Sequence, residues 1–198
     1  MLRREGKSLL EYWRLKKIAK KVRAGILPKG VAKDRIFEAL RITRPNALEV
    51  FGFLEAKVFN PDGTLKQDVG LVSCRQVTAA FAKVLVDGMA DSTVAADLDH
   101  FAYHKMGAGS TAEAADQTAL ITQQEGATLG VQTHGASSQI YQTIGTITAG
   151  SVYGCREHGI FNASTGGTML DRSVVTNIDL NTDDVVTWTY SLTVTAGG

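Results

Sequence analysis

The chain has 198 residues, of which 44% are hydrophobic and 21% are charged, with a net charge of +1. This composition excludes a wholly disordered chain, and the length allows one buried core plus an appendage, since domains most often run to about 100–150 residues. The small net charge hides a division: residues 1–44 hold fourteen Lys/Arg against four Asp/Glu, and residues 45–198 hold seven against sixteen. A basic arm of charge +10 therefore precedes an acidic body of charge −9. This pattern favours an arm that binds an acidic partner, either nucleic acid or an acidic protein surface.

Two cysteines, Cys74 and Cys155, lie far apart and outside any C-x-x-C spacing. We therefore expect two buried free thiols, with no zinc ribbon and no dithiol redox motif. The basic N-terminus lacks the apolar stretch of a signal peptide, and no run approaches the roughly 18 apolar residues of a membrane span. We expect no membrane association and synthesis in a host cytoplasm before assembly.

The arm is predicted to contain two helices. Ser8 followed by Glu11 has the spacing of a capping box and Gly25 supplies a stop, so the first helix should span Ser8–Ala24. A second helix is predicted over Val31–Ile42. The first helix is amphipathic. Its apolar face comprises Tyr12, Leu15, Ile18, Ala19 and Val22, and its opposite face Arg14, Lys17, Lys20 and Lys21.

The body should open with a hairpin. Strands are predicted over Leu54–Phe59 and Leu65–Val72, joined by a turn at Asn60–Gly63 in which Pro and Gly provide the required backbone angles. After it, Ser73 with Gln76 is predicted to cap a helix that ends at Gly88. This helix would present one apolar side to the body.

The second half of the chain is typical of antiparallel strands. A strand is predicted over His100–Met106, followed by a small-residue loop, Gly107–Gln117, with one helical turn from Ser110. From Ala127 onward, short apolar runs alternate with Gly, Thr and Ser. The turns expected between the last strands are Ser164–Gly167 and Asn181–Asp184. In the final strand, Val186, Trp188, Tyr190, Leu192 and Val194 alternate with polar residues, so they should face the core.

These patterns predict a mainly β fold with α: an antiparallel β-sandwich or jelly-roll-like body with one or two packed helices, preceded by a basic helical N-terminal arm. The predicted domain division is 1–45 for the arm and 46–198 for the body.

Metal and catalytic sites are not expected. His100 and His104 lie four residues apart, which in a strand separates the imidazoles by about 13 Å, and Asp97 and Asp99 are explained as solvated loop acids. Gly107–Thr111 could bind an anion through its backbone N–H groups, but a connector is the simpler explanation because P-loop spacing is missing. We expect no catalytic residue, no cofactor and no metal.

Nucleophilic catalysis is also not indicated. The chain has no G-x-S-x-G elbow, and Cys155, Glu157 and His158 lie in an alternating strand where neighbours point to opposite faces. Only Cys155 and Glu157 would share a face.

The basic helix is the one feature that stands out. It could be a plain solvated surface, a docking helix for a partner protein, or a phosphate-binding helix. We favour docking on protein, because Tyr12 and Trp13 are residue types enriched in interfaces. The predicted partner-binding residues are Tyr12, Arg14, Leu15, Lys16, Lys17, Ile18, Lys20, Lys21, Val22 and Arg23.

Two stretches resemble a family of tailed-bacteriophage virion proteins. Residues 103–120, YHKMGAGSTAEAADQTAL, are similar to a short strand followed by G-x-G-[ST]-T-A-x-A-A-x-D-T-A-L. Residues 157–172, EHGIFNASTGGTMLDR, are similar to E-x-G-[LI]-F-x-A-x-x-G-G-T-M-L-x-R. The resemblance implies a shared fold and a small structural role in a head, neck or tail, without a shared active site. It does not extend to residues 1–44.

The sequence as a whole predicts a virion component, and most simply a capsid decoration or cement protein that docks through its arm. The expected partner is the major capsid protein or another virion protein, with further copies of the chain in the particle. Nucleic acid ranks behind protein as the arm's partner. The alternatives are a tail-tip, baseplate or fibre component that binds a host surface, or a head or neck component that contacts DNA.

Overall fold

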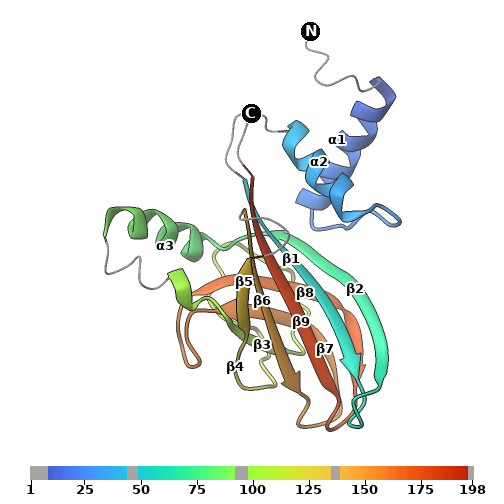
Figure 1. Cartoon of the computed structure of the whole chain (residues 1–198), viewed down its shortest axis with the longest axis vertical. Coiled ribbons are helices and arrows are strands. Elements are labelled where there is room, and N and C mark those ends of the chain that lie inside the picture. Colours follow the sequence, from blue (N-terminus) through green and yellow to red (C-terminus); the bar gives the residue numbers. More distant parts are fainter. Residues whose placement is uncertain (1–8, 44–48, 92–97, 135–138, 196–198) are drawn as a thin grey trace. The chain divides into compact units, whose positions relative to one another are not determined.

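The computed structural model describes residues 9–43, 49–91, 98–134 and 139–195. The chain divides into two compact units, Met1–Val50 with Val194–Gly198, and Phe51–Thr193. Figure 1 shows the helices α1 and α2 of the first unit and the sheets of the second.

The helical unit contains α1 (Leu9–Arg23) and α2 (Lys33–Thr43), so both predicted arm helices are confirmed. The predicted N-cap, Ser8, lies outside the described residues. At the other end of α1, Gly25 has a φ of 71° and donates its N–H to the Val22 carbonyl at 2.9 Å, while Ile26 donates to Lys21 at 2.7 Å. These bonds satisfy carbonyls of the last turn and stop the helix where the sequence placed its end.

The two helices form a hairpin with a small apolar core of its own. Arg35 of α2 bonds Glu11 of α1 at 2.8 Å and Glu38 at 3.1 Å. These pairs are exposed, so burial of the apolar stripes contributes more to the pairing than the charges do. The buried apolar residues are Leu15, Ile18, Ala19 and Val22 of α1, and Ile36, Ala39 and Leu40 of α2.

The body consists of two antiparallel sheets that pack together, which confirms a mainly β fold with helices. The five-stranded sheet has the order β2-β1-β9-β6-β5, and the four-stranded sheet has the order β4-β3-β7-β8. The first contains β1 (Glu49–Phe59), β2 (Leu65–Gln76), β5 (Val131–His134), β6 (Ile140–Thr148) and β9 (Val185–Thr195). The second contains β3 (Tyr103–Gly107), β4 (Thr128–Leu129), β7 (Tyr153–Phe161) and β8 (Met169–Leu180).

The predicted turns have the expected chemistry. In the β1–β2 hairpin, Gly63 has a φ of 81° and Asp62 Oδ1 accepts the N–H of Thr64 at 2.9 Å. In the β8–β9 turn, Asp183 has a φ of 65° and Asp184 Oδ2 accepts the N–H of Asn181 at 2.7 Å. Both strands of the hairpin run further than predicted, because their ladder continues to the pair Phe51 and Gln76.

That longer ladder makes the predicted helix cap wrong. Ser73 is a buried residue inside β2, and the N-cap of α3 (Ala79–Ala90) is Thr78. Thr78 Oγ1 accepts the N–H of Phe81 at 3.1 Å and donates to the Met169 carbonyl at 2.6 Å, so it caps the helix and fastens it to β8. The helix also continues past Gly88, where the sequence predicted its end.

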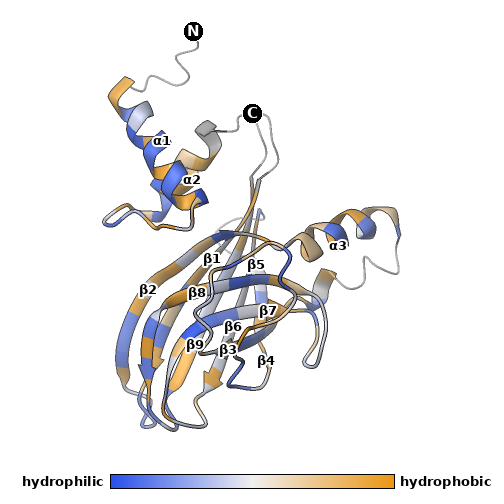
Figure 2. Cartoon of the chain, turned by 180° about the vertical axis from the view of Figure 1, so that it is seen from behind, coloured by the Kyte–Doolittle hydropathy of each residue, from blue (hydrophilic) through white to orange (hydrophobic). Residues whose placement is uncertain are grey.

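The core lies between the two sheets. Val186, Trp188, Tyr190 and Leu192 of β9 are buried, as predicted from their alternation. The ring centroids of Trp188 and His158 of β7 are 4.6 Å apart, so these side chains join the two sheets. Figure 2 shows apolar and polar residues alternating along the strands. Both cysteines are buried free thiols, as expected.

The packing of Trp188 gives a direct test of strand facing. Trp188 has 0% exposure, and truncating a buried Trp typically costs about 3–5 kcal/mol. Trp188→Ala should lower the free energy of unfolding by that amount in denaturant titrations. Thr187→Ala, on the opposite face of β9, should change it by less than about 0.5 kcal/mol. Equal losses from the two variants would contradict this assignment of the strand's faces.

Candidate functional site

A buried cluster of charged and hydrogen-bonding groups in the body is centred on the carboxylate of Glu157 in β7. This carboxylate accepts backbone N–H groups from both ends of residues 108–123, called the strap here. The donors are Gly109 at 3.1 Å, Ile121 at 3.0 Å and Thr122 at 2.6 Å. The helical turn predicted from Ser110 does not form there. The strap instead is irregular, with one hydrogen-bonded turn in which Gln117 donates its N–H to the Ala114 carbonyl at 3.2 Å.

Arg172 of β8 completes this cluster. Its guanidinium bonds Glu157 Oε2 at 2.8 Å and both side chains are about fully buried, at 1% and 0% exposure. It also reaches the strap, where Thr111 O lies at 3.0 Å and Gln117 Oε1 at 3.1 Å. Burial alone would raise the pKa of Glu157, but the N–H donors and Arg172 outweigh it and hold the pKa below its ordinary value. The carboxylate therefore stays ionised, and its oxygens are occupied by hydrogen bonds from the strap and Arg172.

Two glycines allow the strap to approach so closely. A Cβ at Gly107 would lie 2.2 Å from the Thr122 carbonyl oxygen, and one at Gly109 would lie 2.5 Å from Glu157 Oε1. The Gly-x-Gly stretch therefore contributes one backbone N–H, that of Gly109, to an anion site, and the anion is the chain's own carboxylate. The loop is thus more than the plain connector that the sequence favoured, and its anion position is filled by Glu157.

Glu157→Gln should destabilise the body strongly. It removes the negative charge but leaves Arg172 buried, and breaking a buried pair in this way costs about 3–5 kcal/mol. Hydrogen exchange should also become faster at the amides of Gly109, Ile121 and Thr122. Glu125→Gln is the matched control, because Glu125 bonds the Gly150 N–H at 2.8 Å in an exposed position. Unchanged protection of the strap amides in Glu157→Gln would contradict the assigned role.

Two histidines form a second buried cluster, on the inner face of the four-stranded sheet. His104 Nδ1 lies 3.0 Å from His158 Nε2, and His104 Nε2 lies 3.1 Å from Thr143 Oγ1. Gly145 makes room for the first ring, since a Cβ there would lie 2.5 Å from it. Burial lowers the pKa of His104 to about 3 and that of His158 well below its ordinary value. Both rings are therefore neutral and bonded within the chain.

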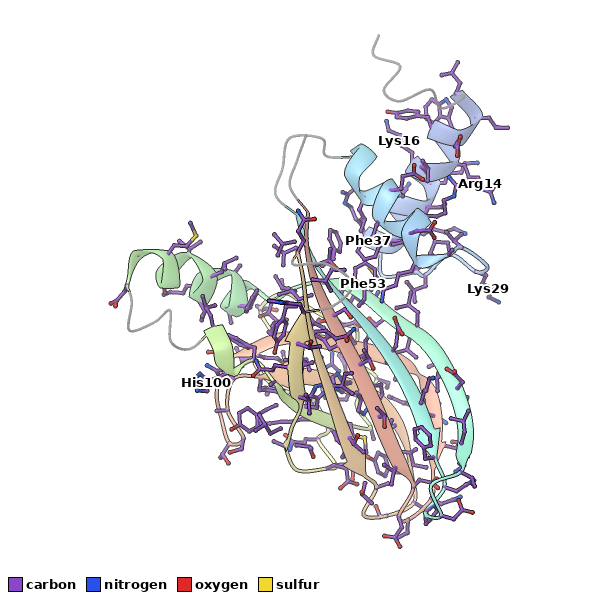
Figure 3. All side chains as sticks on the ribbon, viewed as in Figure 1. Arg14, Lys16, Lys29, Phe37, Phe53 and His100 are labelled. Atoms are coloured by element: carbon purple, nitrogen blue, oxygen red, sulfur yellow. The ribbon has the colours of Figure 1, made fainter. Side chains whose placement is uncertain are left out.

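The two histidines considered in the sequence as metal ligands, His100 and His104, lie in different elements. His100 belongs to a short 3-10 helix, η1 (Leu98–His100), and its side chain is exposed and points away from the sheets (Figure 3). The predicted strand begins only at Tyr103, so His100 and His104 do not share it. Asp97 lies outside the described residues. Within the described part of the chain, no three His, Cys, Asp or Glu side chains are placed to hold a metal ion together.

A third buried group lies where β1 faces the other sheet. Asp171 Oδ2 and the Tyr190 hydroxyl lie beside Gly52, where a Cβ would be 2.6 Å from the first and 2.3 Å from the second. Neither oxygen makes a well-formed hydrogen bond to a described residue. Burial raises the pKa of Asp171 to about 7, so the carboxyl is about half protonated near neutral pH.

Asp171 should make stability depend on pH in a specific direction. Its ordinary pKa is 3.8 and its folded pKa is about 7, so between these values the unfolded chain is ionised while the folded chain retains the proton. Stability therefore falls as pH rises through this window. Asp171→Asn should gain roughly 3 kcal/mol relative to wild type between about pH 4.5 and about pH 8.

Denaturant titrations at the two pH values measure this gain. The matched control is Asp179→Asn, because Asp179 is an exposed carboxylate at the end of β8. A difference between Asp171→Asn and wild type that stays constant between the two pH values would contradict the raised pKa of Asp171.

The predicted partner-binding residues all lie on α1, but they fall into two groups. Leu15, Ile18 and Val22 are buried and occupied within the chain, because they form the apolar stripe beside α2. These three are therefore not presented to a partner on this surface. Arg23 is half-buried. The residues that remain exposed are Tyr12, Arg14, Lys16, Lys17, Lys20 and Lys21.

The exposed part of α1 combines cations with aromatic rings. Lys16 Nζ lies 5.2 Å from the Tyr12 ring centroid and 5.6 Å from that of Trp13. The two rings meet edge to face at 6.0 Å. Figure 3 shows Arg14 and Lys16 projecting from opposite sides of α1. Trp13 was considered in the sequence as an interface type but not included among the binding residues, and its exposure of 57% now places it on this surface.

The sequence did not reveal the partners of Glu157, Arg172 and His158. Glu157 and Arg172 are the first and last residues of the second phage-like stretch, and this position was the only available signal of their importance. No family model, no curated protein and no solved structure matches the chain. No described helix is long and apolar enough to cross a membrane.

Proposed function

We propose that the chain is a structural, non-enzymatic component of a tailed-phage virion, most simply a capsid decoration or cement protein that docks through its N-terminal arm. The observation that carries the proposal is the exposed surface of α1, where Trp13 is 57% exposed beside Lys16 and where Arg14, Lys17, Lys20 and Lys21 form no ion pair with a described residue. Tryptophan, tyrosine and arginine are the residue types that contribute most to protein interfaces. The partner is the major capsid protein or another virion protein, and its surface is acidic.

The buried polar residues of the two phage-like stretches bond within the chain, which supports a binding role over a catalytic one. Glu157, Arg172, His104 and His158 bond one another, the strap or Thr143, and all four are buried. A catalytic group needs access to substrate, which these side chains lack. The phage-like stretches therefore specify a stable body that presents the arm. In a particle, many modest contacts of this kind in fixed register give high avidity.

DNA is the second candidate partner, because the same cations would neutralise phosphates. Phosphate contacts make affinity fall steeply with salt, by roughly a thousandfold between about 50 and 200 mM for six or more contacts. Docking on protein responds less, since its apolar part is not screened. A component that binds a host surface would instead use the loops around Ser137 and Thr165 as its working surface. Ser137 lies outside the described residues, and Thr165 is exposed between β7 and β8.

The proposal is tested by reversing charge on α1 in the full chain. The triple variant Lys16→Glu, Lys17→Glu, Lys20→Glu should fold normally, because all three side chains are exposed. It should lose incorporation into particles at least about tenfold, measured by mass spectrometry of purified virions. Lys29→Glu is the control, since Lys29 is exposed in the loop between the helices, off the α1 surface (Figure 3). Full incorporation of the triple variant, or absence of the wild type from particles, would overturn the proposal.

A further inference from the structure

The solvent-facing side of α1 has an apolar end and a basic end. Leu9, Leu10 and Trp13 are exposed at 63%, 81% and 57%. Residues four apart on a helix are neighbours, so Leu9 lies beside Trp13, and Trp13 beside Lys17. The cations continue along the same side to Lys20 and Lys21. This exposed half of the helix, called the α1 face here, runs from Lys16 at one margin to Arg14 at the other, and comprises Leu9, Leu10, Trp13, Arg14, Lys16, Lys17, Lys20 and Lys21.

The charges of the α1 face are not balanced within the helical unit. Residues 9–43 hold ten Lys/Arg against three Asp/Glu, a net charge of +7. Of these three carboxylates, Glu11 and Glu38 already bond Arg35. None of the five cations of the α1 face forms an ion pair with a residue that the structure describes. The described part of the chain therefore leaves these five cations available to an acidic partner.

The body has the opposite imbalance. Residues 51–193 hold seven Lys/Arg against fifteen Asp/Glu, a net charge of −8. Five of the seven cations are already paired with carboxylates of the body. Exposed carboxylates without a cationic partner therefore remain on its surface, on separate elements. Among the described residues these include Asp62, Asp116, Asp179 and Asp183.

From this complementarity we infer that the α1 face of one copy docks on the acidic body of a second copy of the same chain. The contact is heterologous, because the two sides are different surfaces, and such contacts link copies head to tail. A contact between two α1 faces would instead bring two units of charge +7 together. The inference rests on the proposed function, and of the two partners proposed there it favours another virion protein, which it takes to be a further copy of this chain.

The apolar end of the face argues for a protein occupant over a nucleic acid. Phosphates would neutralise Lys17, Lys20 and Lys21, but they offer nothing that buries Leu9 and Leu10. A protein surface removes both leucines and Trp13 from water, which is the larger favourable contribution. The cations around these three residues then orient the bound partner and select against surfaces that carry few carboxylates.

Sedimentation of the full chain tests the inference. Wild type should self-associate with rising concentration up to about 0.1 mM. Trp13→Ala should weaken association at least about tenfold, whereas Ile26→Ala should leave it unchanged, since Ile26 is exposed in the loop after α1. The triple variant Lys16→Glu, Lys17→Glu, Lys20→Glu should be monomeric alone. Because its body is intact, the fluorescently labelled triple variant should still enter wild-type oligomers and shorten them.

Several results would overturn the inference. These are a monomeric wild type, full association of the triple variant alone, or failure of the labelled triple variant to enter wild-type oligomers. Tight, salt-sensitive binding of duplex DNA that depends on Trp13 and the same lysines would assign the face to nucleic acid instead.

Particle incorporation is scored separately from self-association. A chain that self-associates through α1 but is absent from particles contradicts the proposed function. A chain that enters particles through α1 without self-associating contradicts this inference alone.

Discussion

The buried ion pair between Glu157 and Arg172 joins three parts of the chain that are distant in sequence. It connects adjacent strands β7 and β8, and its remaining hydrogen-bonding positions hold the strap from both ends. A buried ion pair stabilises the fold little more than apolar packing of the same volume would. Its hydrogen-bonding geometry, however, is compatible with few other arrangements of the chain. The pair therefore acts on specificity, because a segment that forms no helix is held in one fixed path against the sheet.

The packing between the sheets follows a second rule, in which polar rings face glycines. His104 lies against Gly145, and Tyr190 lies against Gly52, in each case closer than a Cβ would allow. The core thus accepts neutral imidazoles and a buried carboxyl where aliphatic residues would be simpler. The histidines favour folding more as pH rises toward their ordinary pKa, while Asp171 favours it less. These two slopes oppose each other between mild acid and neutrality.

Local sequence patterns predicted most of the helices and strands, whereas the buried polar clusters are formed by strands that pair across long stretches of the chain. Gly25 stopped α1 and the alternation around Trp188 placed β9, because both signals lie within a few residues. The cap at Ser73 failed because the length of β2 depends on its partner β1, which local spacing does not report. His104 was considered beside His100, four residues away, whereas its true partner His158 is 54 residues away. The pairing of β3 with β7 brings them together, and local spacing in the sequence does not report which strands pair.

The exposed and buried residues of α1 were separated only by the structure. Periodicity correctly grouped Leu15, Ile18 and Val22 on one side, but it did not say whether α2 or a partner would cover them. Trp13 was named as an interface residue type but was not placed in the predicted binding set. It falls on the charged side of the helical wheel, where its ring contacts only Tyr12 and Lys16 of the same helix among the described residues. An aromatic residue on the polar side of a helix was the available signal.

The position of β1 has a mechanical consequence. The chain leaves the helical unit through this strand, which lies between β2 and β9 rather than at an edge of the sheet. Tension on a tethered α1 therefore enters the body at a strand that is hydrogen-bonded on both sides. Extraction of β1 must break its ladders with both β2 and β9, whereas extraction of an edge strand such as β5 would break one ladder. When the arm is held and the body is pulled, the unfolding rate of the body limits how fast β1 is extracted from the sheet. This resistance does not depend on how tightly the arm binds.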